Sequence, residues 1–239
     1  MTDAQMEPVE QAGAADLFEI FYAPSAVFRR RQDGKFGLPY LVLAILGVVI
    51  FLATKNLMQP VIEAEITRGL AQAAAKNPQM TADQLASARK FGETIASAGI
   101  VIFFVVAPFI VAFLIWITAM IARISSAGKV AIMVATFSLY PRLVGSVVGA
   151  IEAAVMPESS ITSAAALSIG PARFVDPVHA PALAAILGRF DLFAIWGIVL
   201  IAIGMQSAAK ATKGQAWTTA IGVWVIASIL PVLQGLRAG

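Results

Sequence analysis

The chain has 239 residues, of which 59% are hydrophobic and only 13% carry a charge. Soluble domains usually contain about 25% charged residues, so a soluble globule of this size would lack the polar side chains needed to cover it. The sequence contains no cysteine and a single histidine, which excludes disulfides, cysteine-bound zinc and a histidine cluster. We therefore expect an all-α integral membrane protein without a metal or other cofactor.

Residues 1–37 form a polar leader with one amphipathic segment. Apolar side chains recur every three or four positions between Leu17 and Phe28, which places them on one helical face. An aromatic face followed by arginines is typical of a helix in the lipid headgroup layer, where anionic phosphates bind the cations. The predicted interfacial anchor consists of Phe21, Pro24, Phe28, Arg29, Arg30 and Arg31.

Two other interpretations of the arginine cluster are excluded by its context. A signal peptide has its cations near the start and a small-residue cleavage site after the apolar run, whereas Arg29 comes late and the run ends in FLATKN. A nucleic-acid site needs more cations than the four found here, and these four are fixed against a bilayer. We therefore expect the lipid bilayer, with anionic lipids, as the partner of the leader and no nucleic acid.

Five apolar segments are long enough to cross a bilayer, which takes about 20 helical residues. The third is the weakest, because it contains Pro141, Arg142 and Glu152. Together they make one predicted membrane domain, residues 38–236. The five predicted spans are 38–54, 95–122, 130–156, 190–209 and 216–236.

The basic residues beside these spans predict their orientation. Arg123 and Lys129 lie in the short connection after the second span, and Lys210 and Lys213 lie in the connection after the fourth. With five crossings, both connections fall on the same side as the leader. Short loops rich in lysine and arginine stay in the cytoplasm, so the N-terminus is predicted to be cytoplasmic and the C-terminus to lie outside.

Residues 55–94, between the first two spans, are predicted to form an extramembrane helical hairpin. One apolar stripe runs from Ile62 to Ala73, and Pro78 interrupts the pattern. Thr81 and Gln84 then have the spacing of a capping box, which begins a helix that continues into the second span.

Three ionisable residues in or beside the spans form a candidate intramembrane polar site. Arg142 falls near the middle of the third span, where an arginine costs about 2.5–3.5 kcal/mol unless it is paired or hydrated. Pro141 breaks the helix beside it, as in many transporter sites. The alternative is that the third segment is two shorter helices and Arg142 reaches the headgroups from the break. Glu152 and Asp191 are possible counter-ions, although Asp191 equally fits a helix N-terminus.

The remaining patterns indicate packing rather than catalysis. Gly145 and Gly149 form a small-xxx-small pair, which lets another helix approach closely, within the chain or from a second copy. The sequence contains no nucleophile-elbow serine, no phosphate-binding glycine loop and no histidine in a span that could serve as a general base. We therefore expect no enzyme activity and no catalytic residue.

The order of these elements resembles the bacterial branch of the Yip family of multi-pass membrane proteins. The resemblance runs from Asp16 to Leu236 and rests on FYAPSAVFRR in the leader and FDLFAIWGIVLIAIGM in the fourth span, together with the five spans. It implies an all-helical domain without known enzyme activity in the bacterial inner membrane. Eukaryotic members act in vesicle trafficking with Rab GTPases, but this chain lacks a DLYGP-like segment, so Rab binding is not carried over.

Three functions are compatible with these patterns. The preferred one is a scaffold or membrane-organising factor that acts through helix–helix and lipid contacts, with another membrane protein or a second copy as its partner. The second is a transporter or channel component with Arg142 in a polar path. The third, a lipid-modifying enzyme, is disfavoured because no acid–base pair is available. A water-filled cavity around Arg142 would favour the second, and an Arg142 sealed by carbonyl groups would favour the first.

Overall fold

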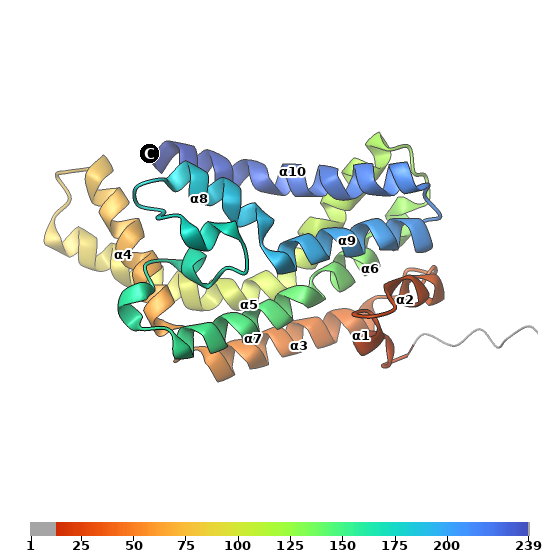
Figure 1. Ribbon diagram of the computed structural model, residues 1–239, viewed down its shortest axis with the longest axis horizontal. Helices are drawn as coiled ribbons and strands as arrows, with labels where there is room; N and C mark the ends of the chain where they lie inside the picture. The colour runs from red at the N-terminus through yellow and green to blue at the C-terminus, as the bar shows by residue number, and fades with distance from the viewer. Residues whose placement is uncertain (1–12, 239) are drawn as a thin grey trace, which may run out of the picture. The chain divides into compact units, whose positions relative to one another are not determined.

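The computed structural model describes residues 13–238, and these form helices and no strand (Figure 1). The described chain divides into two compact units. The leader unit comprises 13–41, Pro108–Ser138 and Ile198–Val223, and the loop unit comprises Val42–Ala107, Leu139–Gly197 and 224–238. The α-helices are α1 (Asp16–Glu19), α2 (Pro24–Arg30), α3 (Gly37–Thr54), α4 (Gln59–Lys76), α5 (Ala82–Ile121), α6 (Ala127–Ser138), α7 (Tyr140–Val155), α8 (Pro181–Leu187), α9 (Leu192–Ser207) and α10 (Lys213–Ala238). Short 3-10 turns are η1 (Glu158–Ser160), η2 (Ala164–Leu167), η3 (Pro171–Phe174) and η4 (Gly188–Phe190).

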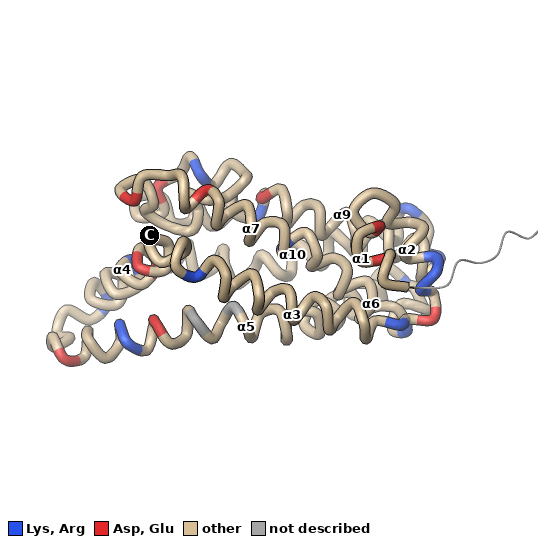
Figure 2. Tube along the Cα trace, turned by 90° about the horizontal axis from the view of Figure 1, so that it is seen from below, with Lys and Arg blue, Asp and Glu red and all other residues tan. Residues whose placement is uncertain are grey.

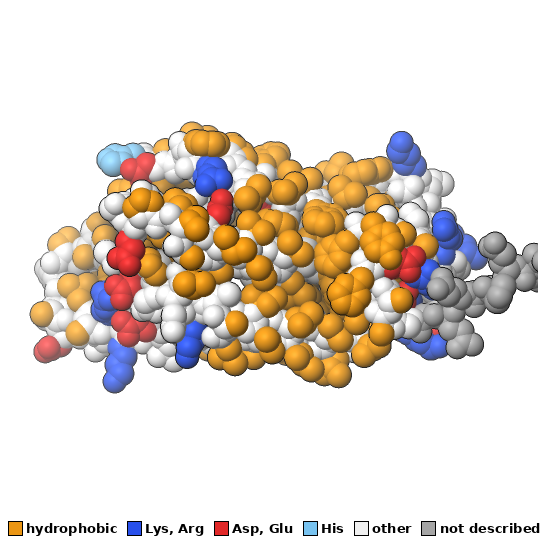
Figure 3. Space-filling view, turned by 60° about the horizontal axis from the view of Figure 1, so that its bottom comes forward, with side chains coloured by type: hydrophobic (Ala, Val, Ile, Leu, Met, Phe, Trp, Pro, Cys, Tyr) orange, Lys and Arg blue, Asp and Glu red, His pale blue; other side chains and the backbone are white. Residues whose placement is uncertain are grey.

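Within the described chain, four segments are long and apolar enough to cross a membrane, and a fifth qualifies if a bent pair counts as one span. The four are Gly37–Thr54, Val101–Ile121, Ala127–Val155 and Lys213–Ala238. The predicted fourth span differs most from the sequence interpretation. Its helix α9 has 16 residues and qualifies only together with Pro181–Phe190, from which it is bent by 49°. Large apolar side chains are exposed along these helices, as lipid contact requires (Figure 3).

The predicted break in the third span is present. Helix α6 ends at Ser138 and α7 begins at Tyr140, with Pro141 in the first turn of α7, where the missing N–H of proline leaves no hydrogen bond unmade. Ala127–Val155 is nevertheless long enough, at 29 residues, to count as one span. Pro141 therefore lies where α7 begins, and the candidate span continues through it.

The core of the leader unit is built on the leader itself. Ile20, Val27 and Phe28 are completely buried, and the Phe28 ring meets the Phe137 ring of α6 edge to face, with centroids 5.9 Å apart. A Cβ at Gly204 of α9 would lie only 3.2 Å from the Phe28 ring, so glycine permits this close approach. The leader is thus packed as an integral part of its unit.

Helix α4 and the first turns of α5 contact each other within the loop unit. A Cβ at Gly92 would lie 3.6 Å from Ile66, and Arg89 lies 3.6 Å from Glu63. The predicted capping box is confirmed: the Thr81 backbone N–H donates to Gln84 Oε1 at 3.0 Å, and the Gln84 N–H donates to Thr81 Oγ1 at 3.3 Å. Helix α3 ends at Thr54 and α4 begins at Gln59, so α4 is a separate helix and not an extension of α3. The extramembrane position of the pair stays a prediction.

Replacing Gly34 by alanine is expected to destabilise the leader unit by at least about 1–2 kcal/mol. Gly34 has φ +81°, a left-handed conformation that costs a residue with a Cβ about that much, and the added Cβ would lie 2.2 Å from the Lys129 carbonyl oxygen of α6. Thermal unfolding in detergent measures the change. Gly37→Ala is the matched control, because nothing lies within 4 Å of a Cβ there. Equal midpoints for the two variants would contradict the prediction.

Candidate functional site

Two arginines of the leader are held by the carboxylates of Asp16 and Glu19. Figure 2 shows the acidic and basic positions of the leader close together around α1 and α2. Asp16 is 1% exposed and accepts from Arg30 Nη2 at 2.6 Å and from Arg31 Nε at 2.7 Å. Glu19 binds Arg30 as well. The remaining Arg31 donors bind the backbone oxygens of Lys35 and Gly13, each at 3.1 Å. Each charge buried here is therefore paired, as burial requires. We call Asp16, Glu19, Arg30 and Arg31 the leader charge cluster.

The carboxylates of the leader charge cluster favour the charged form of Arg30. Hydrogen bonding to Glu19 raises the pKa of Arg30, and Asp16 adds to the effect against the opposing influence of burial. Arg31 also lies over the Phe137 ring, with its guanidinium carbon 5.5 Å from the ring centroid. These contacts fix α1 and α2 to each other and fix Arg31 to α6.

The predicted interfacial anchor is therefore divided between two environments. Pro24 begins α2, as expected, but Phe28, Arg30 and Arg31 turn inward and bind protein groups rather than lipid phosphates. Arg29 is exposed and Phe21 is half-buried. The anchor role predicted for these two residues stays a prediction.

Two outward aromatic residues of the leader were missed by the sequence analysis. Phe18 is 75% exposed and Tyr22 is 78% exposed, and they lie four positions apart in and just after α1. Their spacing could have singled them out, but they fall off the longer apolar stripe, whose period alone suits a lipid-facing helix. Phe18, Tyr22 and Arg29 are thus exposed in the leader, and we call these three residues the leader face.

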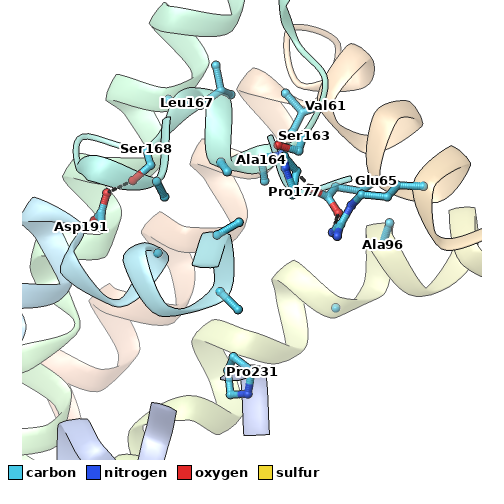
Figure 4. A pocket seen from close by; sticks show the side chains of 18 of the residues that line it. Val61, Glu65, Ala96, Ser163, Ala164, Leu167, Ser168, Pro177, Asp191 and Pro231 are labelled. Atoms are coloured by element: carbon cyan, nitrogen blue, oxygen red, sulfur yellow. Dashed lines mark hydrogen bonds and ion pairs between the residues drawn. The ribbon is translucent and has the colours of Figure 1, made fainter. Parts of the chain in front are cut away.

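The loop unit contains a cavity of about 1170 Å³ (Figure 4). Its walls come from α3, α4, α5, α7, α8, α10 and the segment between α7 and α9. Arg142 lines this cavity and is half-buried. Within residues 13–238, its guanidinium forms no hydrogen bond and no ion pair, although Asp191 acts on it electrostatically. Carbonyl groups therefore do not seal Arg142, and its charge faces the cavity.

The two predicted counter-ions of Arg142 are bound by other groups. Asp191 accepts from the backbone N–H of Phe193 at 3.0 Å, which caps α9, and from Ser168 Oγ at 3.2 Å. This agrees with the alternative that placed Asp191 at a helix N-terminus. Glu152 pairs with Arg173 at 3.3 Å. Arg142, Glu152 and Asp191 thus do not form a chain of mutually paired charges.

The two glycines of the predicted packing motif have different surroundings. A Cβ at Gly145 would lie 2.8 Å from the Phe193 ring, so this glycine lets α7 pack under an aromatic side chain of α9. Nothing lies within 4 Å of a Cβ at Gly149, which lines the cavity. Of the two glycines of this motif, Gly145 is therefore the one that makes a close contact among the described residues.

A polar wall of the cavity joins α4 to the loop before α9 and was not predicted. Glu65 accepts from the Ala164 backbone N–H at 2.8 Å and also binds Arg68 (Figure 4). Ser163 beside it is 2% exposed. Its Oγ and the Nε of Arg68 are buried and have no hydrogen-bond partner in the described structure. Because 99 residues separate Glu65 from Ala164, no local pattern could reveal this contact.

Comparison with known proteins yields one family and one relative. The model of the Yip1 domain matches residues 18–233. "Membrane protein YknW" of Bacillus subtilis (strain 168) is 26% identical over 223 residues, which cover 92% of this chain and 90% of the relative. No solved structure matches.

Proposed function

This chain belongs to the Yip1 domain family, as its sequence resemblance indicated, and we propose that it is a non-enzymatic scaffold that organises other membrane components. It is a membrane protein, and the family that matches is not a catalytic one. In our proposal it lies in the bacterial inner membrane and binds a membrane protein or a second copy of itself. Arg142 lines a cavity and no carbonyl group seals it, which is the arrangement named above as favouring transport. Its possible counter-ions Asp191 and Glu152 are bound by other groups, however, so no path of paired charges continues from Arg142, and we keep the scaffold as the proposal.

The observation that carries this proposal is the fixed leader face. Exposed aromatic residues such as Phe18 and Tyr22 are enriched where proteins bind one another or the membrane interface. Phe18 lies in α1 and Tyr22 just after it, and Arg30 and Arg31 hold α1 through Asp16. A flexible tail would lose entropy on binding, whereas this pre-ordered surface loses little.

Photo-crosslinking tests the scaffold function. A benzophenone amino acid at Tyr22, in native membranes, is expected to give a protein adduct of one reproducible mass. Adding Asp16→Asn is expected to weaken that adduct, because it loosens α1. The control is the same probe at Asp83, which is exposed at the start of α5. Adducts with lipid alone, or the same adduct from Asp83, would overturn the proposal.

We further propose that α4 and the start of α5 form a hairpin outside the membrane, with the N-terminus in the cytoplasm. The chain has no native cysteine, so single cysteines report accessibility without background. An impermeant thiol reagent on intact cells is expected to label positions Ser87 and Ser160, both exposed here, and to spare Gln32 and Gln215. Labelling at Gln215 in intact cells would contradict this orientation of the five spans.

A further inference from the structure

The cavity of the loop unit carries unbalanced positive charge. Arg142, Lys76 and Arg237 line it, and within the described chain none of their side chains forms an ion pair or hydrogen bond. The two acidic lining residues are already bound: Glu65 to Arg68 and Ala164, and Asp191 to Ser168 and the start of α9. A cavity with free cations and bound acids favours an anionic ligand.

The polar wall adds two hydrogen-bond donors that lack acceptors. Ser163 Oγ and Arg68 Nε belong to lining residues, are buried, and have no partner among the described residues. A buried donor without an acceptor costs free energy, so such groups are usually satisfied by a ligand or by water. Both groups donate to oxygen, and phosphate oxygens are strong acceptors for guanidinium and hydroxyl groups.

Another part of the cavity wall is apolar and belongs to two candidate spans. Phe51 of α3 and Phe103 and Phe104 of α5 line this side. Gly99 and Gly149 also line the cavity, and a Cβ at either would meet nothing within 4 Å. At about 1170 Å³ the cavity exceeds the roughly 300–1,000 Å³ of sites for small ligands, so a phosphate ion alone would leave most of it unfilled.

We propose that this cavity binds an anionic phospholipid. The phosphate-bearing headgroup meets Arg142 and the donors of the polar wall, and an acyl chain lies along Phe51, Phe103 and Phe104. The proposal explains why an arginine within a span lacks a protein partner: the lipid supplies the anion. It goes beyond the scaffold function, and its site shares no residue with the leader face.

Thermal unfolding of the purified full chain in a neutral detergent, with added lipid, tests the site. Phosphatidylglycerol is expected to raise the unfolding midpoint of the unmodified protein, whereas zwitterionic phosphatidylcholine and inorganic phosphate are not. Arg142→Gln is expected to weaken phosphatidylglycerol binding about tenfold or more, because one charge-assisted contact is lost. Arg89→Gln is the control, since Arg89 lies in an exposed ion pair and does not line the cavity.

A second variant separates loss of the site from loss of the fold. Gly149→Leu fills the cavity without removing any charge and improves helix propensity, so it is expected to retain folding and to lose the stabilisation by phosphatidylglycerol. Equal stabilisation by both lipids, or unchanged binding by Arg142→Gln and Gly149→Leu, would overturn the proposal. Equal stabilisation by inorganic phosphate would overturn the lipid assignment in favour of a free phosphate ion. Photo-crosslinking through Tyr22 is independent of all these outcomes.

Discussion

Replacing Asp16 by alanine is expected to lower the free energy of unfolding by about 3–5 kcal/mol, because the buried Arg31 loses its carboxylate partner. Asp16 binds both Arg30 and Arg31. Arg31 is only 4% exposed, so water cannot replace the carboxylate without opening the packing around it. Unfolding of the purified protein in detergent, followed by the midpoint and slope of the transition, measures the effect.

The matched control for this substitution lies in the same leader. Asp33 pairs with Lys35 at 2.9 Å, but both side chains are largely exposed. Exposed ion pairs contribute about 0–1 kcal/mol, so Asp33→Ala is expected to leave stability nearly unchanged. If the two variants lose the same stability, the leader charge cluster is not the element that holds the leader in place.

Replacing Phe28 by alanine is expected to cost about 3–5 kcal/mol, the usual range for deleting a buried aromatic ring. The ring is fully buried, contacts Phe137 of α6, and fills the space left by Gly204 of α9. Its loss opens a cavity among three helices that the rest of the leader cannot fill. The same unfolding measurement applies.

Tyr22→Ala is the companion variant for Phe28→Ala. Tyr22 is six residues upstream and exposed, so its removal is expected to change stability by less than about 0.5 kcal/mol. If Phe28→Ala proves as mild as Tyr22→Ala, the leader does not pack against α6 and α9. The pair also serves the crosslinking experiment, because it establishes that position 22 can be altered without unfolding the unit.

Four of the five predicted spans correspond to candidate spans in the described chain, because a bilayer imposes one simple requirement, a long apolar run. The spacing of Ile20, Val27 and Phe28 also identified a common face correctly. What covers that face could not be predicted, because a stripe buried against other helices has the same period as one immersed in lipid. Arg31 illustrates the difficulty, since its carboxylate partner lies 15 residues upstream and its aromatic partner lies in α6.

The candidate site was predictable to a similar extent. Arg142 was identified because a charge within an apolar run is rare, and the structure places it on the wall of a cavity. Its surroundings were not predictable, because they come from the irregular segment after α7, which has no periodic pattern. Glu152 is a possible counter-ion of Arg142 by its place in the sequence, yet it pairs with Arg173 of that segment.

The leader charge cluster also indicates an order of events during synthesis. Its partners lie 11 to 15 residues apart, so the ion pairs can close as soon as the leader has been made, before the first span is complete. Phe28 can pack against Phe137 only after Phe137 has been synthesised, which at a synthesis rate of 5–20 residues per second takes about 5–20 s more. During that interval the membrane surface is the nearest apolar environment in which the apolar face of the nascent leader can be buried. We therefore expect that a ribosome-bound chain truncated before α6 attaches to lipid through Phe28, and that the finished protein has exchanged this contact for an internal one.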